Sequence, residues 1–277
     1  MLSELFHYLT TSCPPAHRRL GYLSGLIAIQ ARYQRIGQQW ENHLHNTRQL
    51  ILKAVQQCPQ HDKVVVLGSG LLLDVPLAQL SQCFKEVVLI DVVQLRSIRQ
   101  HCKKLSNVTL LEYDITGLAA PLLTYRRHDP LPSPEVKFPD FILASDLIIS
   151  CNLLSQLALT PNQFLQQHHN IKAAQLQSWC RAILENHLTA LIEHTGQCCL
   201  ISDIQHNYLD VNNSLLERQE MLFGLSLGTP DQEWQWALAP LGEVDKHYQL
   251  HATVQGFYNC PPVPLLWTTS NPCKDSQ

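Results

Sequence analysis

The sequence predicts an α/β protein that is built on a doubly wound, mostly parallel sheet. Three observations support this prediction. Short, wholly apolar segments rich in β-branched residues recur along the chain, segments with helical periodicity separate them, and the first apolar segment opens directly into a glycine turn at residues 68–70. Apolar segments of this length form strands that are buried on both faces. Parallel strands require a crossover, which is usually a helix, so the alternation predicts a sheet with helices on both sides.

The N-terminal region is expected to be helical. Between residues 20 and 57, apolar and aromatic side chains recur at helical spacing, as at Leu23, Ile27 and Trp40. This periodicity is typical of amphipathic helices that pack on a core. We therefore expect a helical cover over residues 1–60, a sheet domain over residues 61–260 and a tail over residues 261–277.

Five strands are expected from the apolar segments, at residues 64–67, 87–90, 108–111, 147–149 and 198–201. The fourth strand has an alternative at residues 140–144. The later segment is preferred because Asn152 would then serve as the N-cap of the next helix. One helix is expected to begin near Asp74, with Pro76 in its first turn, and another to span residues 173–194.

The last third of the chain has a different pattern. A helix is expected at residues 212–224, whereas residues 233–238 and 248–257 alternate between apolar and polar and are joined by a turn with proline and glycine. Two alternating segments joined in this way predict a hairpin, so the sheet is expected to end in an antiparallel strand. Four prolines predict a surface loop at residues 125–139, and the tail from Pro261 is expected to be a surface-packed or frayed end.

Composition disfavours several classes of function. The chain has 277 residues, with 20 Lys+Arg against 23 Asp+Glu and no basic run. Nucleic acid and anionic lipid require clustered Lys and Arg, so both are disfavoured as partners. Ten scattered cysteines without a CxxC favour a reduced, cytoplasmic protein, and fourteen histidines without HExxH or HxH predict no metal site. The sequence shows neither a signal peptide nor an apolar segment long enough to span a membrane, so we expect a soluble protein.

The glycine turn is the first candidate for a binding site. Gly68, Ser69 and Gly70 follow a buried strand and precede a helix, where glycine lets the backbone approach a ligand and a helix N-terminus favours a negative group. Asp91 closes the second strand, where an acidic side chain can accept hydrogen bonds from both hydroxyls of a ribose. The alternatives are an ordinary strand-to-helix turn for the glycines and a helix N-cap for Asp91.

Two further observations narrow the class of ligand. Leu73 occupies the third position of a G-x-G-x-x-G pattern, so a pyrophosphate is less favoured than a smaller adenosine compound. After the third strand, Asp114 could accept a hydrogen bond from an adenine amino group while Ile115 packs on the ring face. The alternative for Asp114 is a turn or cap residue.

These segments together resemble the class I S-adenosylmethionine-dependent methyltransferases over roughly residues 62–258. The resemblance rests on VVVLGSG, VLID, LEYDI, DLIISCNLLSQL and the terminal hairpin. It implies a seven-stranded sheet whose last strand is antiparallel, with S-adenosylmethionine as the cofactor. The implied cofactor contacts are Gly68, Ser69 and Gly70 at the methionine part, Asp91 at the ribose, Asp114 and Ile115 at the adenine, and Ser150 and Asn152 beside the sulfonium.

The sequence departs from the family pattern at two positions. Val66 stands where the family usually has an acidic residue, and Leu72 stands where a third glycine is common. Both positions concern the amino-acid end of the cofactor, for which Asp74 is the substitute candidate.

Candidates for the acceptor side follow the fourth and fifth strands: Asn152, Ser155, Gln156, Asp203, His206 and Tyr208. Methyl transfer needs alignment and, for a protonated acceptor, a base, so His206, Asp203 and Tyr208 are predicted as the catalytic residues. The alternatives are a solvated loop histidine and an aspartate that caps a turn.

The N-terminal helix offers further polar candidates. Arg32, Arg35 and His43 could face an anionic acceptor or the cofactor carboxylate. The alternative is a solvated arginine face, with Trp40 packing the helix onto the domain. Trp234 and Trp236 share one strand face, which is expected to be buried against a helix, with an aromatic acceptor clamp as the alternative.

We therefore expect a methyltransferase that acts on a small molecule or on a protein side chain. The alternatives are an NAD(P)-dependent oxidoreductase, which would also use a glycine turn and Asp91, a noncatalytic adenosine-binding protein of the same fold, and an enzyme that moves the aminopropyl group of the same cofactor. The sequence leaves the oligomeric state open.

Overall fold

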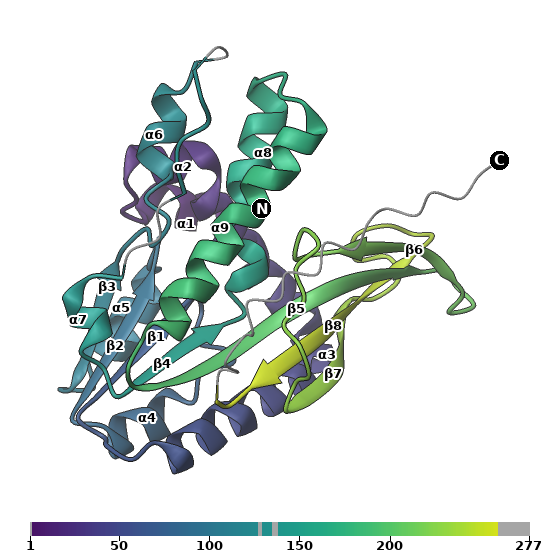
Figure 1. Ribbon diagram of the computed structural model, residues 1–277. Coiled ribbons are helices and arrows are strands. Elements are labelled where there is room, and N and C mark those ends of the chain that lie inside the picture. The colour runs from purple at the N-terminus through teal and green to yellow at the C-terminus, as the bar shows by residue number, and fades with distance from the viewer. Residues whose placement is uncertain (1, 127–128, 135–137, 260–277) are drawn as a thin grey trace.

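The centre of the molecule is an eight-stranded sheet. The computed structural model describes residues 2–126, 129–134 and 138–259. The strand order is β3-β2-β1-β4-β5-β8-β7, and β6 pairs with β5 (Figure 1). Strands β1 to β4 and the first part of β5 are parallel, whereas β6, β7 and β8 are antiparallel to their neighbours. The predicted α/β class and the antiparallel end of the sheet are confirmed.

The strands are β1 (Lys63–Leu67), β2 (Glu86–Asp91), β3 (Val108–Glu112), β4 (Leu147–Cys151), β5 (Gln197–Leu209), β6 (Leu215–Glu220), β7 (Gln232–Ala239) and β8 (Gln249–Phe257). The helices are α1 (Leu2–Thr10), α2 (Pro15–Leu20), α3 (Tyr22–Gln57), α4 (Leu77–Cys83), α5 (Arg96–Cys102), α6 (Ala119–Thr124), α7 (Asp140–Leu143), η1 (Leu154–Gln156), α8 (Leu159–His168) and α9 (Ala173–Ile192).

The parallel strands are buried on both faces. Val65 and Leu67 of β1 join the core beneath α6, α8 and α9, whereas Val64 and Val66 join the core against α3 and α4. Successive side chains of a strand point to opposite faces, so one short apolar segment anchors two layers of helices. Burial of each such side chain contributes roughly 1.5–3 kcal/mol. This alternation is the physical basis of the doubly wound arrangement.

Helix α3 extends from the carboxyl end of the parallel strands to the opposite end of the sheet and packs against β7 (Figure 1). Trp40 is buried in this contact, and its indole Nε1 donates a hydrogen bond to the carbonyl of Leu238 at 3.1 Å. Helix α2 packs against α6 and α8, close to where β1, β2 and β3 end (Figure 1). Helix α2 and the first turns of α3 therefore lie at the carboxyl ends of the parallel strands, whereas the second half of α3 packs on one face of the sheet.

Residues 212–224 do not form the predicted helix. They include β6, which pairs with β5, and two turns in which Asn213 and Phe223 have positive φ angles. Asp210 Oδ1 accepts hydrogen bonds from the backbone N–H groups of Asn212 and Ser214, which favours a tight turn over a first helical turn. Strand β6 is therefore an eighth strand in a sheet for which seven were expected.

Three smaller expectations about the elements are also wrong. Helix α4 begins at Leu77, with Pro76 at its N-cap, and does not begin near Asp74. Asn152 has a φ of 48° and caps no helix; the short η1 helix follows it. Strand β5 continues to Leu209, because its second half pairs with both β6 and β8.

Other expectations hold. The fourth strand is the later of the two alternatives, since residues 140–143 form α7. Within residues 125–139, the described positions form no helix or strand, as predicted for a surface loop. The predicted tail from Pro261 lies outside the described residues. Among the described helices, none is both long and apolar enough to cross a membrane.

Candidate functional site

A cavity of about 500 Å³ lies at the carboxyl ends of the parallel strands. The strand order reverses between β1 and β4, and the residues that follow these two strands line the cavity. In doubly wound sheets, ligands bind at this switch point, outside the carboxyl ends of the strands. The first turns of α3 cover the cavity, and β5, β7 and β8 bound its far end. Cavities of this size accommodate small molecules and cofactors.

The glycine turn forms one wall of the cavity. Gly68 and Gly70 have φ angles of 77° and 45°, and the backbone N–H groups of Gly68 and Ser69 both donate to the carbonyl of Ile90 at 3.0 and 3.1 Å. A Cβ atom at Gly68 would lie 2.9 Å from the Cys151 carbonyl oxygen, whereas at Gly70 no atom would come nearer than 3.9 Å. Gly68 is therefore required by packing, and Gly70 faces open space in the cavity.

Ser69 lies beneath the turn. Its side chain is fully buried, and Ser69 Oγ accepts a hydrogen bond from Gln94 Nε2 at 3.1 Å. Leu72, at the position where the family commonly has a third glycine, adopts a φ of 58°. A leucine thus occupies a left-handed conformation that glycine would adopt without strain.

Asp91 holds the turn from the end of β2. Its Oδ2 accepts a hydrogen bond from the N–H of Gly70 at 2.7 Å, and its Oδ1 accepts one from the N–H of Val92 at 2.8 Å. Burial raises the pKa of the Asp91 carboxyl, and backbone N–H groups lower it by a smaller amount. Asp91 also lines the cavity, so a lone pair that the backbone N–H groups of Gly70, Val92 and Val93 do not occupy can accept a hydrogen bond from a ligand there.

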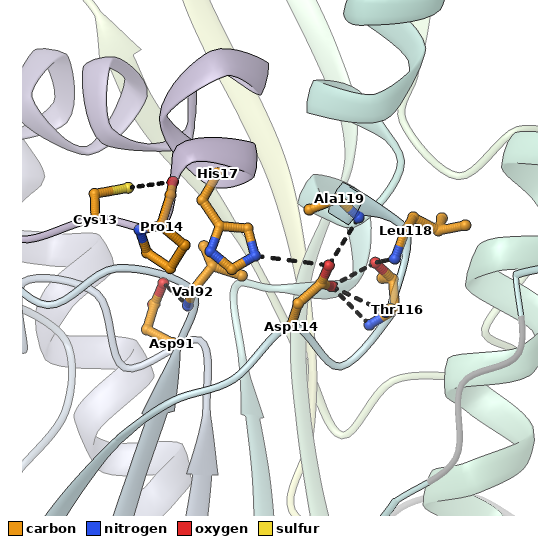
Figure 2. A network of polar contacts seen from close by, with 10 residues as sticks. Cys13, Pro14, His17, Asp91, Val92, Asp114, Thr116, Leu118 and Ala119 are labelled. Atoms are coloured by element: carbon orange, nitrogen blue, oxygen red, sulfur yellow. Dashed lines mark hydrogen bonds and ion pairs between the residues drawn. The ribbon is translucent and has the colours of Figure 1, made fainter. Parts of the chain in front are cut away.

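Asp114 is held tightly after β3. Its Oδ1 accepts from the N–H and hydroxyl of Thr116 and from the N–H of Gly117, and its Oδ2 accepts from the N–H of Ala119. Figure 2 shows Thr116 and Ala119 on one side of Asp114 and His17 of α2 on the other, with His17 Nε2 3.8 Å from Asp114 Oδ2. Burial raises the pKa of Asp114, but the hydrogen bonds outweigh burial and the net pKa lies below its usual value. Asp114 is thus a turn residue that also lines the cavity, next to the buried Ile115.

A polar network joins the glycine turn, β4 and α3. Asn152 Nδ2 donates to Asp74 Oδ2 at 2.6 Å and lies 3.3 Å from His43 Nε2, while Asn152 Oδ1 is buried without a partner. Trp234 Nε1 donates to His43 Nδ1 at 3.1 Å. An indole N–H can only donate, so Nδ1 is unprotonated and the ring proton is on Nε2. Burial lowers the pKa of His43 to about 4, against smaller opposite effects of Asp74 and Asp203.

Ser150 is separated from the cavity. It is fully buried in β4, and its hydroxyl lies 3.0 Å from His187 Nε2 on α9. Burial lowers the pKa of His187 to about 3. Ser150 is not among the residues that line the cavity, whereas Asn152, two positions further, is.

Asp203 and His206 line the far end of the cavity from strand β5, not from a loop as expected. His206 Nε2 donates to Asp203 Oδ2 at 2.7 Å, and the Ser155 hydroxyl donates to Asp203 Oδ1. Only 3% of Asp203 and 9% of His206 are exposed. Because Nε2 of His206 is committed to Asp203, Nδ1 is the ring nitrogen available to a bound molecule. Tyr208 lies away from the cavity, where its hydroxyl donates to Gln219 Oε1 at 3.1 Å.

Aromatic rings close the same end. Trp236 stacks on His43, with ring centroids 3.9 Å apart and an angle of 7°, and Trp40 meets Trp236 edge-on at 5.2 Å. Arg32 also lines the cavity, and its Nε lies 3.6 Å from Glu243 Oε1. Arg35 forms an ion pair with Glu243 on the surface and does not line the cavity.

The structure therefore brings together most of the residues that the sequence singled out. Those that line the cavity are Gly68, Ser69, Gly70, Asp91, Asp114, Ile115, Asn152, Asp203 and His206. Ser150 and Tyr208 do not. Sequence reasoning missed the contribution of the first turns of α3, through Tyr22, Leu26 and Ile29, because their helical spacing also fits ordinary core positions.

Comparisons with known proteins give similarities of low sequence identity. No protein-family model matches the chain, and no curated protein sequence matches it. Among solved structures, the chain is similar to a Burkholderia thailandensis 1,6-didemethyltoxoflavin-N1-methyltransferase with bound 1,6-didemethyltoxoflavin and S-adenosylhomocysteine, at 12% identity over 89% of this chain and 92% of that one, with a TM-score of 0.39. It is also similar to a DhpI–SAH complex, at 10% identity over 84% and 95% of the two chains, with a TM-score of 0.36.

A third similar structure is the N-methyltransferase NodS from Bradyrhizobium japonicum WM9 in complex with S-adenosyl-L-homocysteine. It shares 14% identity over 76% of this chain and 85% of that one, with a TM-score of 0.33. The assignment of the site in this chain rests on its own side chains.

Proposed function

We propose that this chain is an S-adenosylmethionine-dependent methyltransferase. The observation that carries the proposal is the hydrogen bond between Asp91 and the N–H of Gly70 at the switch point of the sheet. It sets a carboxylate with free lone pairs beside a glycine turn whose second glycine faces open space. The ribose hydroxyls of the cofactor need a hydrogen-bond acceptor, and its methionine part needs a cavity wall without side chains.

The residues around the turn fit an adenosyl sulfonium. Asp91 would accept from the ribose hydroxyls, and Ile115 would pack on the adenine. Asp114 Oδ2 accepts from the N–H of Ala119 and faces His17 Nε2 at 3.8 Å, so the adenine amino group would donate to Oδ2 in place of His17. Asp114 can therefore hold the turn after β3 and also bind the adenine amino group.

The amino-acid end of the cofactor would lie beside Asp74 and Asn152. The buried Asn152 Oδ1 has no partner among the described residues, and an unpaired buried oxygen costs about 1–3 kcal/mol. An ammonium group would supply donors to both Asn152 Oδ1 and Asp74. This pair would replace the acidic residue that the family usually has at the position of Val66.

When bound, the cofactor supplies a methyl group that is displaced from a sulfonium by an in-line nucleophile. The chain's own contribution is alignment and proton transfer. His206 Nδ1 can take a proton from an acceptor at the far end of the cavity. Asp203 holds the ring in the tautomer that this requires, and Ser155 fixes Asp203. Ser155 and Asp203 therefore act as positioning residues for His206.

Calorimetric titration of the purified protein tests the cofactor assignment. S-adenosylhomocysteine and S-adenosylmethionine should both bind, and NADH should not. Incubation with methyl-labelled S-adenosylmethionine and a metabolite extract should then transfer label to an acceptor. Binding without transfer would indicate a noncatalytic adenosine-binding protein, and binding of NADH in place of both sulfur compounds would indicate an oxidoreductase.

A further inference from the structure

We infer that the acceptor is a small-molecule amine that enters the far end of the cavity as a cation, between Trp40, Trp236 and the Asp203–His206 pair. This inference rests on the proposed function, and it narrows the methyl acceptor from an unspecified nucleophile to a positively charged amine.

The charges that face the cavity are predominantly negative. Four aspartates line it, namely Asp74, Asp91, Asp114 and Asp203, whereas Arg32 is the one lysine or arginine among the described residues that line it. The carboxylate of Glu243, 3.6 Å from the Nε of Arg32, is shared between Arg32 and Arg35. The proposed cofactor would occupy Asp74, Asp91 and Asp114, so Asp203 is the aspartate that faces the acceptor. An acceptor with a carboxylate or phosphate would place a second negative charge beside Asp203, which raises its electrostatic free energy.

The histidine in the aromatic wall adds no positive charge. Trp234 donates to His43 Nδ1, so protonation of that atom would break a buried hydrogen bond. Burial also lowers the pKa of His43 to about 4, and the ring is neutral near pH 7. The wall therefore presents a neutral imidazole stacked on an indole, and it does not repel a cation.

Asp203 is a carboxylate that a cation would compensate. It is 3% exposed, and its bonded neighbours are the Ser155 hydroxyl and the His206 imidazole. Removing an ionised carboxylate from water is costly unless it is paired, and a charge-assisted partner offsets that cost best. In the described part of the chain, neither lysine nor arginine approaches Asp203 as an ion-pair partner.

The indoles at this end favour the same class of ligand. Trp40 and Trp236 both line the cavity, and an ammonium group over an indole is stabilised by about 0.5–2 kcal/mol. Leu238 and Leu250 supply apolar contact for the rest of the molecule. An ammonium with an attached apolar group therefore matches the walls.

The free nitrogen of His206 fits the proton that such an acceptor must lose. An ammonium has no lone pair until one proton leaves, and His206 Nδ1 can accept that proton while Nε2 stays bonded to Asp203. The amine is then neutral and nucleophilic. A free imidazole nitrogen is a suitable base for an ammonium, and a weak one for an alcohol.

The depth of the site favours a small molecule over a protein side chain. Trp40 of α3 and Asp203 of β5 are each 3% exposed, and His206 of β5 is 9% exposed, where α3 packs against β5 and β7. A group on a folded protein would have to reach these residues through a long, thin side chain. A free amine reaches them without that constraint.

Calorimetric titration with three probes of the same shape tests the inference. Benzylamine, benzyl alcohol and benzoate are each added to the protein alone and to the protein with S-adenosylhomocysteine. Benzylamine should bind at least tenfold more tightly than benzyl alcohol, and benzoate should bind most weakly. Equal or tighter binding of the alcohol or benzoate, or no binding of benzylamine at millimolar concentration, would overturn the inference.

Two variants test whether Asp203 is the residue that favours binding of benzylamine. Asp203→Asn keeps the shape of the side chain, and it should reduce benzylamine affinity at least tenfold with S-adenosylhomocysteine affinity unchanged. Asp62→Asn removes one carboxylate from an exposed ion pair with Lys85, outside the cavity, and it should leave both affinities unchanged. Equal effects of the two variants would overturn the inference.

The outcome separates the two proposals. If S-adenosylhomocysteine does not bind, the proposed function fails, whatever the probes do. If S-adenosylhomocysteine binds and the preference for benzylamine is absent in the wild type, only the acceptor class is wrong. The wild-type comparison of benzylamine with benzyl alcohol needs no variant, so it decides the matter even if Asp203→Asn does not fold. Transfer of methyl label to the macromolecular fraction of a lysate, and not to small amines, would also contradict the inference.

Discussion

The carboxylate of Asp91, at the end of β2, accepts a hydrogen bond from the backbone N–H of Gly70 at 2.7 Å. One side chain thereby fixes the conformation of the glycine turn and presents its remaining lone pairs to the cavity. Helix α4 and strand β2 separate the turn from the carboxylate in sequence, and the parallel pairing of β1 with β2 brings them together. Asp91 is therefore the residue at which fold and proposed binding site can be tested together.

Replacement of Asp91 separates these two roles. Asp91→Ala leaves the N–H groups of Gly70 and Val92 without acceptors and should lower the free energy of unfolding by about 1–3 kcal/mol. It should also abolish the thermal stabilisation by S-adenosylhomocysteine. Asp91→Asn, which keeps one acceptor oxygen, should retain most of the stability and lose at least tenfold in affinity. Stabilisation by the ligand that is equal in Asp91→Ala and wild type would remove the proposed ribose contact.

The two glycines should respond differently to alanine. At Gly68, a Cβ atom would lie 2.9 Å from backbone and side-chain atoms of the β4 loop, so Gly68→Ala should destabilise the fold by roughly 2 kcal/mol or more. At Gly70, where the space is open, Gly70→Ala should cost about 1 kcal/mol for its positive φ and place a methyl group in the cavity. Gly70→Ala should thus lose ligand affinity at modest cost in stability. Urea unfolding and calorimetry measure both quantities; an unaltered ligand affinity in Gly70→Ala would place the ligand elsewhere.

His206 is expected to affect methyl transfer and not cofactor binding. His206→Gln removes the basic Nδ1 and should lower the rate of labelled methyl transfer by roughly 10²–10⁴-fold. Calorimetry should show S-adenosylhomocysteine affinity within about threefold of wild type. Tyr208→Phe is the matched control, because Tyr208 lies outside the cavity and should leave the rate unchanged. A slow Tyr208→Phe with a normal His206→Gln would reverse the assignment.

The protein should lose stability as the pH falls from 7 to 5. Burial lowers the pKa of His43 to about 4, so the folded imidazole is neutral, whereas an unfolded one titrates near 6.5. The unfolded state then binds more protons in this range, which lowers the free energy of unfolding by about 2 kcal/mol for this group. His43→Gln should remove that amount of the pH dependence, measured as the difference between urea unfolding at pH 7 and at pH 5. An identical difference in variant and wild type would show that His43 is not held neutral.

The sheet could be predicted from the sequence because its strands are short and wholly apolar. Residues 64–67 and 87–90 are short and rich in β-branched residues, which favours strands buried on both faces. Strand β6 could not be predicted in the same way. All of its residues are exposed, and it forms because the extended β5 offers a free edge beyond the end of β4. Its conformation is a consequence of tertiary pairing that no local periodicity contains.

The candidate site could likewise be predicted only in part. Gly68, Gly70 and Asp91 could be predicted because each follows a recognisable strand. The direction in which a side chain points could not. Ser150 and Asn152 are two positions apart, yet Ser150 bonds to His187 in the core while Asn152, with its positive φ, turns toward Asp74. The pairing of Asp203 with His206 depends on β5 continuing past residue 203, which is decided by β8.

The most direct test is a crystal structure of the protein with S-adenosylhomocysteine. The account predicts adenosine at the carboxyl ends of β1, β2 and β3, with the ribose hydroxyls bonded to Asp91 and the amino-acid end beside Asp74 and Asn152. Adenosine bound away from the turn at residues 68–70, or no bound compound at millimolar concentration, would contradict it.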